Sequence, residues 1–96
     1  IFASNDKIAI GAIKAIQEAG LRVPQDICII GFDDIEECKY INPPLTTIKM
    51  DLEKMAEVST DAIITSIEGE ENVYTDYTIG VDLIERKTCI ELKKYL

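Results

Sequence analysis

The sequence predicts an α/β fold in which helices flank a parallel sheet. Three features support this prediction: an apolar start at Ile1-Phe2-Ala3, helical periodicity behind it, and a second apolar run at residues 27–30. Short apolar runs rich in β-branched residues are typical of strands buried on both faces, as parallel strands are. Strand, helix and strand in this order predict a β-α-β unit with a right-handed crossover.

The first helix is expected from about residue 6 to residue 19. Ser4 or Asn5 can cap its free amides, and Gly20 can adopt the left-handed conformation that ends a helix. Pro24 then prevents the helix from continuing before the next strand. The apolar residues that recur at helical spacing are Ile8, Ala9, Ala12, Ile13, Ala15, Ile16 and Ala19.

The second half of the chain predicts a strand, a helix and further strands. Pro43-Pro44 favour extended backbone, so residues 45–49 are expected to form a strand. Asp51 can cap a second helix that Gly69 ends. One side of this helix is formed by Leu52, Met55, Ala56, Ser59, Ala62, Ile63 and Ile67.

The end of the chain has β character. Residues 70–72 are expected to form a solvated turn, and residues 73–85 one or two strands. Within them, Ile79, Val81 and Leu83 alternate with Gly80, Asp82 and Ile84. Residues 91–96 are expected to form a short helix or a frayed tail.

Composition excludes several classes of function. The 96 residues are enough for one small domain, and the formal charge of −8 would repel nucleic acid. The absence of histidine excludes nucleophile–histidine catalysis and imidazole metal ligation. The three cysteines form no Cys-x-x-Cys pair, so we expect reduced thiols and neither a metal nor another cofactor. Without a membrane-length apolar run or a signal-like start, a cytoplasmic protein is expected.

Two polar side chains follow the first two predicted strands. Asn5 comes after the first strand, and Asp33 comes after the second. In parallel sheets, ligands bind in the crevice at the carboxyl ends of the strands. An amide and a carboxylate there can together hold a polyol. The alternative is that Asn5 only caps the helix and Asp33 only caps a turn.

Two further interpretations concern the loop that follows. Asp33, Asp34, Glu36 and Glu37 form an acidic cluster that could hold a divalent cation or act as a phosphoacceptor pocket. The Lys-Pro pair expected of a phosphoacceptor domain is missing. Large apolar groups stand in the same polar loop at Tyr40 and Ile41, which indicates either a protein contact or folding back onto the domain.

The chain resembles the effector-binding core of LacI/GalR-type transcriptional repressors, which are relatives of periplasmic sugar-binding proteins. The resemblance extends over most of positions 1 to 90. It rests on an ordered series of blocks: Asn5-Asp6 with Ala9-Ile10-Gly11, Gly20-Leu21-Arg22-Val23-Pro24-Gln25-Asp26-Ile27, Ile30-Gly31-Phe32-Asp33-Asp34, and Asn42-Pro43-Pro44-Leu45-Thr46-Thr47-Ile48.

The resemblance implies a single partial periplasmic-binding-protein-like domain over residues 1–96, centred on the C-terminal lobe. Residues 1–48 and 80–90 would lie in that lobe, and residues 49–79 would belong to the N-terminal lobe. The DNA-binding head is expected to be absent from this piece. The second helix would then lack its usual partner, and it would pack back on its own sheet or be exchanged with a second chain.

The resemblance also implies roles for individual residues. Asn5 and Asp33 would bind the ligand, whereas Asp34 would serve the local backbone. The hinge between the lobes would be formed by Thr47, Ile48 and Lys49. The face that joins two copies would be formed by Ile10, Lys14, Glu37, Tyr40 and Ile41.

The function implied is that of an effector sensor rather than an enzyme. A small sugar-like effector would bind between the two lobes and alter the operator affinity of a homodimer. Operator DNA would be bound only through the N-terminal domain. The alternative is a periplasmic-type sugar-binding protein of a transport system, although unpaired cysteines argue against an oxidising compartment.

Overall fold

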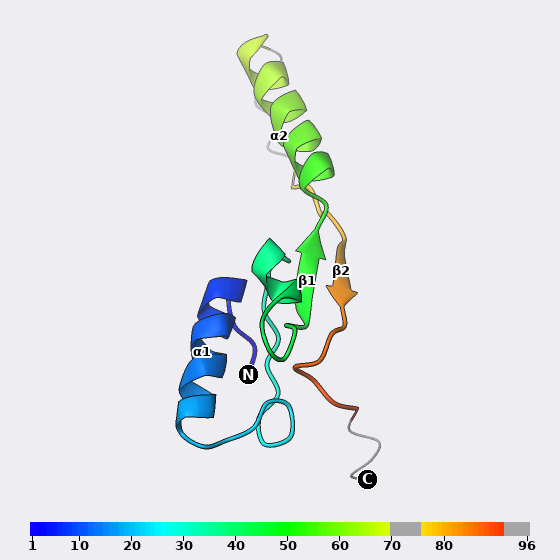
Figure 1. The fold of residues 1–96 in the computed structure, drawn as a ribbon. Helices are drawn as coiled ribbons and strands as arrows, with labels where there is room; N and C mark the ends of the chain where they lie inside the picture. Colours follow the sequence, from blue (N-terminus) through cyan, green and yellow to red (C-terminus); the bar gives the residue numbers. More distant parts are fainter. Residues whose placement is uncertain (70–75, 92–96) are drawn as a thin grey trace. The chain divides into compact units, whose positions relative to one another are not determined.

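The structure, a computed structural model, describes residues 1–69 and 76–91. The predicted turn at residues 70–72, most of the predicted tail and part of the predicted strand region lie outside them. The elements in chain order are α1 (Asp6–Glu18), the 3₁₀ helix η1 (Glu36–Lys39), β1 (Thr47–Met50), α2 (Leu52–Ile67) and β2 (Val81–Ile84) (Figure 1). The chain forms two compact units: one contains Ile1–Lys49 and the chain from Asp82 onward, and the other contains Met50–Val81.

Helix α1 confirms the first predicted helix. Asn5 caps it, since its side-chain oxygen accepts a hydrogen bond of 2.9 Å from the backbone amide of Ile8. Ala9 and Ile13 are the apolar residues of this helix that are buried. The predicted apolar face is wrong at Ile8, which is 54% exposed. Ile8 lies one residue before Ala9 and is therefore rotated about 100° away from the core side.

An extended segment at residues 29–33 takes the place of the second predicted strand. The amide of Ile30 donates to the carbonyl of Ile1 (2.9 Å), and the carbonyl of Ile30 accepts from Ala3 (2.8 Å). Phe2 and Ile30 form a parallel bridge, which confirms the parallel pairing predicted for the β-α-β unit. The expected strand at 27–30 is wrong in extent, because the Ile27 amide still bonds to the Arg22 carbonyl in the preceding turn, and because the paired segment runs on to Asp33.

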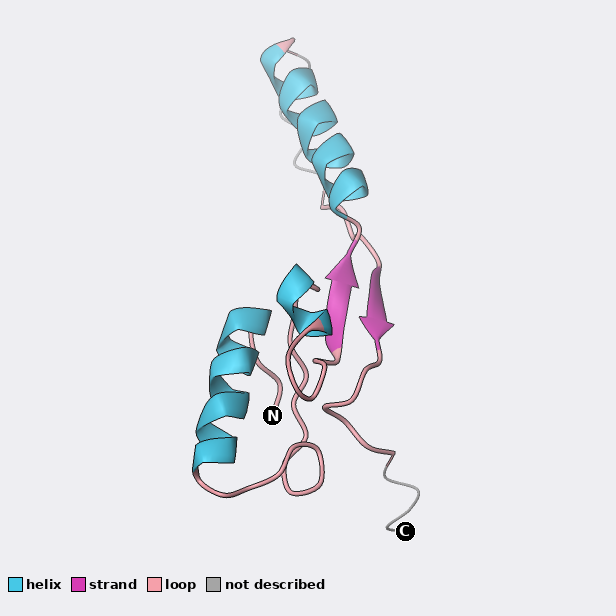
Figure 2. Ribbon diagram, viewed as in Figure 1, coloured by secondary structure: helices cyan, strands magenta, loops and turns pink. Residues whose placement is uncertain are grey.

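The other edge of this extended segment lies along β1. The amides of Gly31 and Asp33 donate to the carbonyls of Thr46 and Ile48, both at 2.9 Å. Since both bonds advance by two residues along each chain, this pairing is also parallel. Strand β1 in turn pairs with β2, and the two arrows run in opposite directions (Figure 2).

The core of the first unit is small and mostly aliphatic. Ile29 and Leu45 are its largest fully buried apolar side chains. The other buried members are Ala3, Ala9, Ile13, Val23 and Cys38, and the half-buried residues packed against them are Ile10, Ala12, Ile16, Ile27, Ile35 and Ile41. The core therefore joins α1 to the extended segment and to Leu45, two residues before β1.

Helix α2 confirms the second predicted helix, with both predicted ends. Asp51 caps it by accepting from the amide of Lys54 at 3.0 Å, and Gly69 follows with a φ of +76°. No residue of α2 is buried, and Ile67 is 78% exposed. Strand β2 lies within the predicted strand region, and in it Val81 and Leu83 are exposed while Ile84 is half-buried. None of the helices in the described part of the chain is long and apolar enough to cross a membrane.

Candidate functional site

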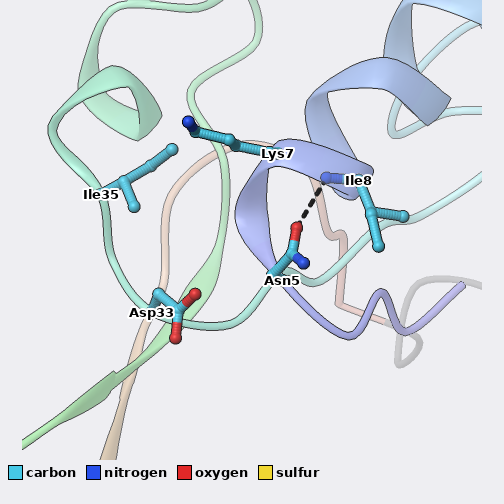
Figure 3. Close-up of a pocket in the computed structure, with 5 residues that line it drawn as sticks. All are labelled: Asn5, Lys7, Ile8, Asp33 and Ile35. Atoms are coloured by element: carbon cyan, nitrogen blue, oxygen red, sulfur yellow. Dashed lines mark hydrogen bonds between the residues drawn. The ribbon is translucent and has the colours of Figure 1, made fainter.

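Asn5 and Asp33 line one open hollow of about 420 Å³ (Figure 3). Asn5 immediately precedes α1, and Asp33 ends the extended segment, so both stand at carboxyl ends of paired, parallel segments. The remaining lining residues are Lys7, Ile8 and Ile35. The hollow falls in the size range of small-molecule sites and combines charged, amide and aliphatic groups. The sequence had thus predicted residues that the fold brings together.

Asn5 has two roles at this opening. Its side-chain oxygen caps α1, as the alternative interpretation held. Its amide nitrogen has no hydrogen-bond partner among the described residues and is free to donate to a bound molecule. Asp33 is exposed, and no described residue forms a hydrogen bond or ion pair with its carboxylate. One donor and one charged acceptor therefore remain available.

The loop that carries Asp33 has a strained backbone. Asp33 has a φ of 118° and Asp34 a φ of 57°, in the region that L-residues rarely occupy. Such conformations cost about 1–3 kcal/mol each and persist where the surroundings hold them. Two contacts do so here: the amide of Asp33 donates to Ile48, and Asp34 forms a 2.7 Å ion pair with Arg86. Strain of this kind is concentrated at ligand-binding positions.

Asp6 lies beneath this loop and is completely buried. One carboxylate oxygen accepts from the Thr47 hydroxyl at 2.5 Å. The other accepts from the Ile35 amide at 2.9 Å and from the Cys38 thiol at 3.1 Å. Burial by itself raises the pKa of Asp6. Hydrogen bonds from these three groups and from the Asp34 amide lower it by more, so the pKa of Asp6 lies below its ordinary value.

Cys38 is a neutral partner of this carboxylate. Burial, together with the hydrogen bond to Asp6 and the charge of Asp6, raises the pKa of the Cys38 thiol to about 12. The thiol therefore keeps its proton at neutral pH and donates a hydrogen bond to Asp6. All three cysteines are free, and Cys38 is the buried one.

Acidification should destabilise the protein through Asp6. Because its folded pKa is lower than its unfolded pKa, its contribution is fully present above 3.8 and is lost as pH falls through the folded value. We expect the difference in free energy of unfolding between the native chain and Asp6→Asn to narrow between about pH 6 and about pH 3. Urea denaturation at both values measures it.

The matched comparison for this titration is Asp26→Asn. Asp26 has a lowered pKa because its side chain accepts hydrogen bonds from Arg22, but it lies at the surface. Its substitution should have little effect on stability at either pH, since exposed ion pairs contribute little. A difference between native chain and Asp6→Asn that is independent of pH would contradict the buried, charged state of Asp6.

Arg86 and two threonines join the loop to the chain after β2. The Arg86 guanidinium bonds the Asp34 carboxylate and the Leu45 carbonyl (2.9 Å), and both charged side chains are 14% exposed. The Arg86 amide donates to the Thr46 hydroxyl at 2.9 Å. The Thr88 hydroxyl accepts from the Thr46 amide and donates to the Ile29 carbonyl. The Asp34 carboxylate thus pairs with a side chain that follows β2, and the service to the local backbone that the resemblance implied stays a prediction.

The acidic-cluster interpretation has no geometric support. Asp34 is paired with Arg86, and Glu36 lies beside Lys39 with 3.8 Å between charged atoms. Among residues 1–69 and 76–91, no group of three Cys, Asp or Glu side chains is placed to hold a metal ion. Asp34 and Glu36 therefore pair with two different basic side chains and do not converge on one point.

The predicted dimer-face residues lie on α1 and around η1. Tyr40 is 76% exposed and its hydroxyl donates to Glu36 at 3.1 Å, so it does not fold back into the core. Lys14 and Glu37 are exposed, whereas Ile10 and Ile41 are half-buried against the core. Their role at an interface stays a prediction.

The predicted hinge residues lie in β1. Thr47 is buried against Asp6, and the carbonyl of Ile48 accepts from Asp33. Lys49 is exposed and is the last residue of the first unit before the chain enters the second. Their role as a hinge, and the assignment of residues 49–79 to another lobe, stay predictions.

A larger hollow, of about 700 Å³, lies where the extended segment begins. Among its lining residues are Gln17, Pro24 and Lys87. It is thus placed near the amino ends of the paired segments, whereas ligands of parallel α/β sheets bind at the carboxyl ends. Position in the fold therefore favours the hollow at Asn5 and Asp33.

Known proteins match this chain over most of its length. Residues 1–89 match the family model of the periplasmic binding protein-like domain. The HTH-type transcriptional regulator MalR of Clostridium butyricum is 43% identical over 93 residues, which cover 96% of this chain and 27% of MalR. The chain thus spans about a quarter of that relative.

Two solved structures have the same fold. A periplasmic binding protein/LacI transcriptional regulator from Alkaliphilus metalliredigens QYMF, complexed with D-xylulofuranose, is 37% identical with a TM-score of 0.81, covering 95% of this chain and 34% of that one. The lac repressor dimer bound to operator and an anti-inducer is 39% identical, also with a TM-score of 0.81, covering 94% and 31%. The α/β fold predicted from the sequence is therefore confirmed.

Proposed function

Because this chain belongs to the periplasmic binding protein-like family of LacI-type transcriptional regulators, we propose that it forms part of the effector-binding domain of a transcriptional repressor. Its effector would be a small sugar. Since the chain spans about a third or less of the relatives described above, the activity of the whole protein is part of this proposal.

The observation that carries the proposal is the shared hollow of Asn5 and Asp33. A sugar hydroxyl is both donor and acceptor, and this opening offers it an amide N–H and a free carboxylate. Lys7 adds a charged donor, and Ile8 and Ile35 supply aliphatic surface for the ring. The D-xylulofuranose bound to one relative supports a sugar of this kind.

The proposed response is a change in the balance between two lobe arrangements. The ligand would bind between the lobe built on residues 1–48 and 80–90 and a second lobe to which residues 49–79 belong. Thr47, Ile48 and Lys49 would form the hinge. The sugar must bind one arrangement more tightly, because equal affinity for both would shift nothing.

Operator control would require two copies and a separate DNA-binding segment. The formal charge of −8 makes this chain itself a poor DNA ligand. We propose that the homodimer face includes the exposed Tyr40 with Lys14 and Glu37, and the half-buried Ile10 and Ile41. The protein would be cytoplasmic and would have no catalytic role.

A transport-type sugar-binding protein remains the second candidate, since it would use the same hollow. The regulator is favoured because the matched relatives are named as transcriptional regulators and repressors. Operator binding by the longer protein that carries this chain distinguishes the two.

Replacing Asp33 with Ala tests the proposed ligand contact. In the longer regulator, we expect the affinity for the sugar to fall at least about tenfold, the loss of one charge-assisted hydrogen bond. Operator affinity without sugar should be unchanged. Calorimetry with D-xylulose and a panel of other pentoses and hexoses measures the first quantity, and DNA-binding titration measures the second.

The matched control for that substitution is Asp61→Ala, on the exposed surface of α2. It should alter neither affinity. Sugar binding that survives Asp33→Ala unchanged would refute the assigned contact, and failure of the native protein to bind any sugar of the panel would refute the proposed class of ligand.

A further inference from the structure

Three segments of the chain meet at one buried carboxylate. Asp6 begins α1, directly after Asn5. Its side chain accepts hydrogen bonds from the Ile35 amide, two residues after Asp33, and from Thr47, the first residue of β1. Asn5, one of the two proposed ligand contacts, is therefore next to Asp6 in the chain. Asp33, the other, is two positions from Ile35, whose amide bonds to Asp6.

The space around this carboxylate is fully occupied. A Cβ atom added at Gly31 would lie 2.2 Å from the Asp6 carboxylate oxygen and 3.0 Å from a Leu45 methyl group. Asp6 has an exposed fraction of 0%, and so has Thr47. Neither the carboxylate nor its donors can shift without breaking contacts, because packed interiors have few voids.

The loop needs such a support. Its positive φ angles at Asp33 and Asp34 are retained only while neighbouring contacts hold them. Asp6 supplies one such contact just after the strained pair in the chain, by accepting from the Ile35 amide. Strand β1 supplies another at the pair itself, where the Ile48 carbonyl accepts from the Asp33 amide. Through Thr47, both contacts depend on the same strand.

We propose that Asp6 is a positioning residue, which holds the Asp33 loop in its ligand-ready conformation and couples it to β1 through the hydrogen bond from Thr47. The inference rests on the proposed function, since it names how the site at Asn5 and Asp33 is connected to the proposed hinge. A displacement of β1 at Thr47 would be transmitted to Ile35, and movement of the loop would be transmitted to β1.

The test measures this coupling without a ligand. Thr47→Val removes the hydroxyl donor and nearly preserves side-chain shape. We expect the protection factor of the Ile35 amide against hydrogen exchange to fall at least about threefold. A change of this size corresponds to part of the net free energy of one ordinary hydrogen bond. The pKa of Asp6, measured by carbon-13 NMR titration, should rise. Thr47→Ser retains the hydroxyl and should restore both.

Thr46→Val is the matched control for a merely structural effect. Thr46 is the neighbouring residue, is equally buried, and its hydroxyl also takes part in one hydrogen bond, from the Arg86 amide. It should leave the Ile35 protection and the Asp6 pKa unchanged. An unchanged Ile35 protection in Thr47→Val, or an equal loss in Thr46→Val, would overturn the proposal.

This outcome is separate from that of the sugar screen. The exchange and pKa measurements need only the chain itself, so they give the same answer whatever the ligand is. Asp6→Asn gives a second test of the coupling, because it leaves one oxygen and introduces an amide group toward the donors. It should reduce Ile35 protection more than Thr47→Val does, and a smaller reduction would count against Asp6 as the support.

Discussion

Replacing Asp6 with Ala should lower the free energy of unfolding by about 3–5 kcal/mol. The substitution leaves the Thr47 hydroxyl and the Ile35 amide buried without an acceptor, and each unsatisfied group costs about 1–3 kcal/mol. The Cys38 thiol loses its acceptor as well. The strained loop also loses a support. Urea denaturation at neutral pH measures the change.

Asp61→Ala provides the comparison for that experiment. Asp61 is an exposed carboxylate on α2, so its loss should change the free energy of unfolding by less than about 0.5 kcal/mol. A similarly small effect of Asp6→Ala would mean that the buried network around this carboxylate does not stabilise the folded chain.

Sequence patterns were sufficient for the two α-helices and for bringing Asn5 and Asp33 to one place in the fold. Apolar spacing and a capping residue, Asn5 or Asp51, determine where each helix begins, and both signals are local. The rule that ligands bind at the carboxyl ends of parallel strands was sufficient to bring Asn5 and Asp33 together. It needs only the order of elements, not their packing.

The same patterns could not identify Asp6 as the centre of the network. An aspartate in the first turn of a helix is usually a solvated residue that favours the helix dipole. Its burial depends on Thr47, which is 41 positions away in the chain. Lys7 was missed for the same reason, because its place at the hollow depends on how the Asp33 loop folds over the start of α1.

The prediction of where a strand begins and ends was wrong for a related physical reason. Backbone pairing between residues 29–33 and two neighbouring segments depends on register, and the local sequence of one segment does not specify its register against segments distant in the chain. The alternation of residues in β2 says only that the two faces of the strand differ. It does not say which face another part of the protein covers.

Arg86 is the second residue whose loss should have a large effect. In Arg86→Leu, the Asp34 carboxylate remains 14% exposed without its 2.7 Å partner, on a backbone with a φ of 57°. Removing one member of a mostly buried ion pair costs about 3–5 kcal/mol, and we expect about 2–4 kcal/mol here because some solvent reaches both groups. The Leu45 carbonyl also loses a donor.

A double-mutant cycle separates the unpaired charge from the lost packing. Adding Asp34→Asn to Arg86→Leu removes the buried charge, so the double variant should regain about 1–2 kcal/mol relative to Arg86→Leu alone. Lys39→Leu is the matched control, because its pair with Glu36 is 55% and 69% exposed and contributes less than about 1 kcal/mol. If the double variant were no more stable than Arg86→Leu, the cost would lie in packing and in the Leu45 contact, and the ion pair would not be what holds the Asp33 loop.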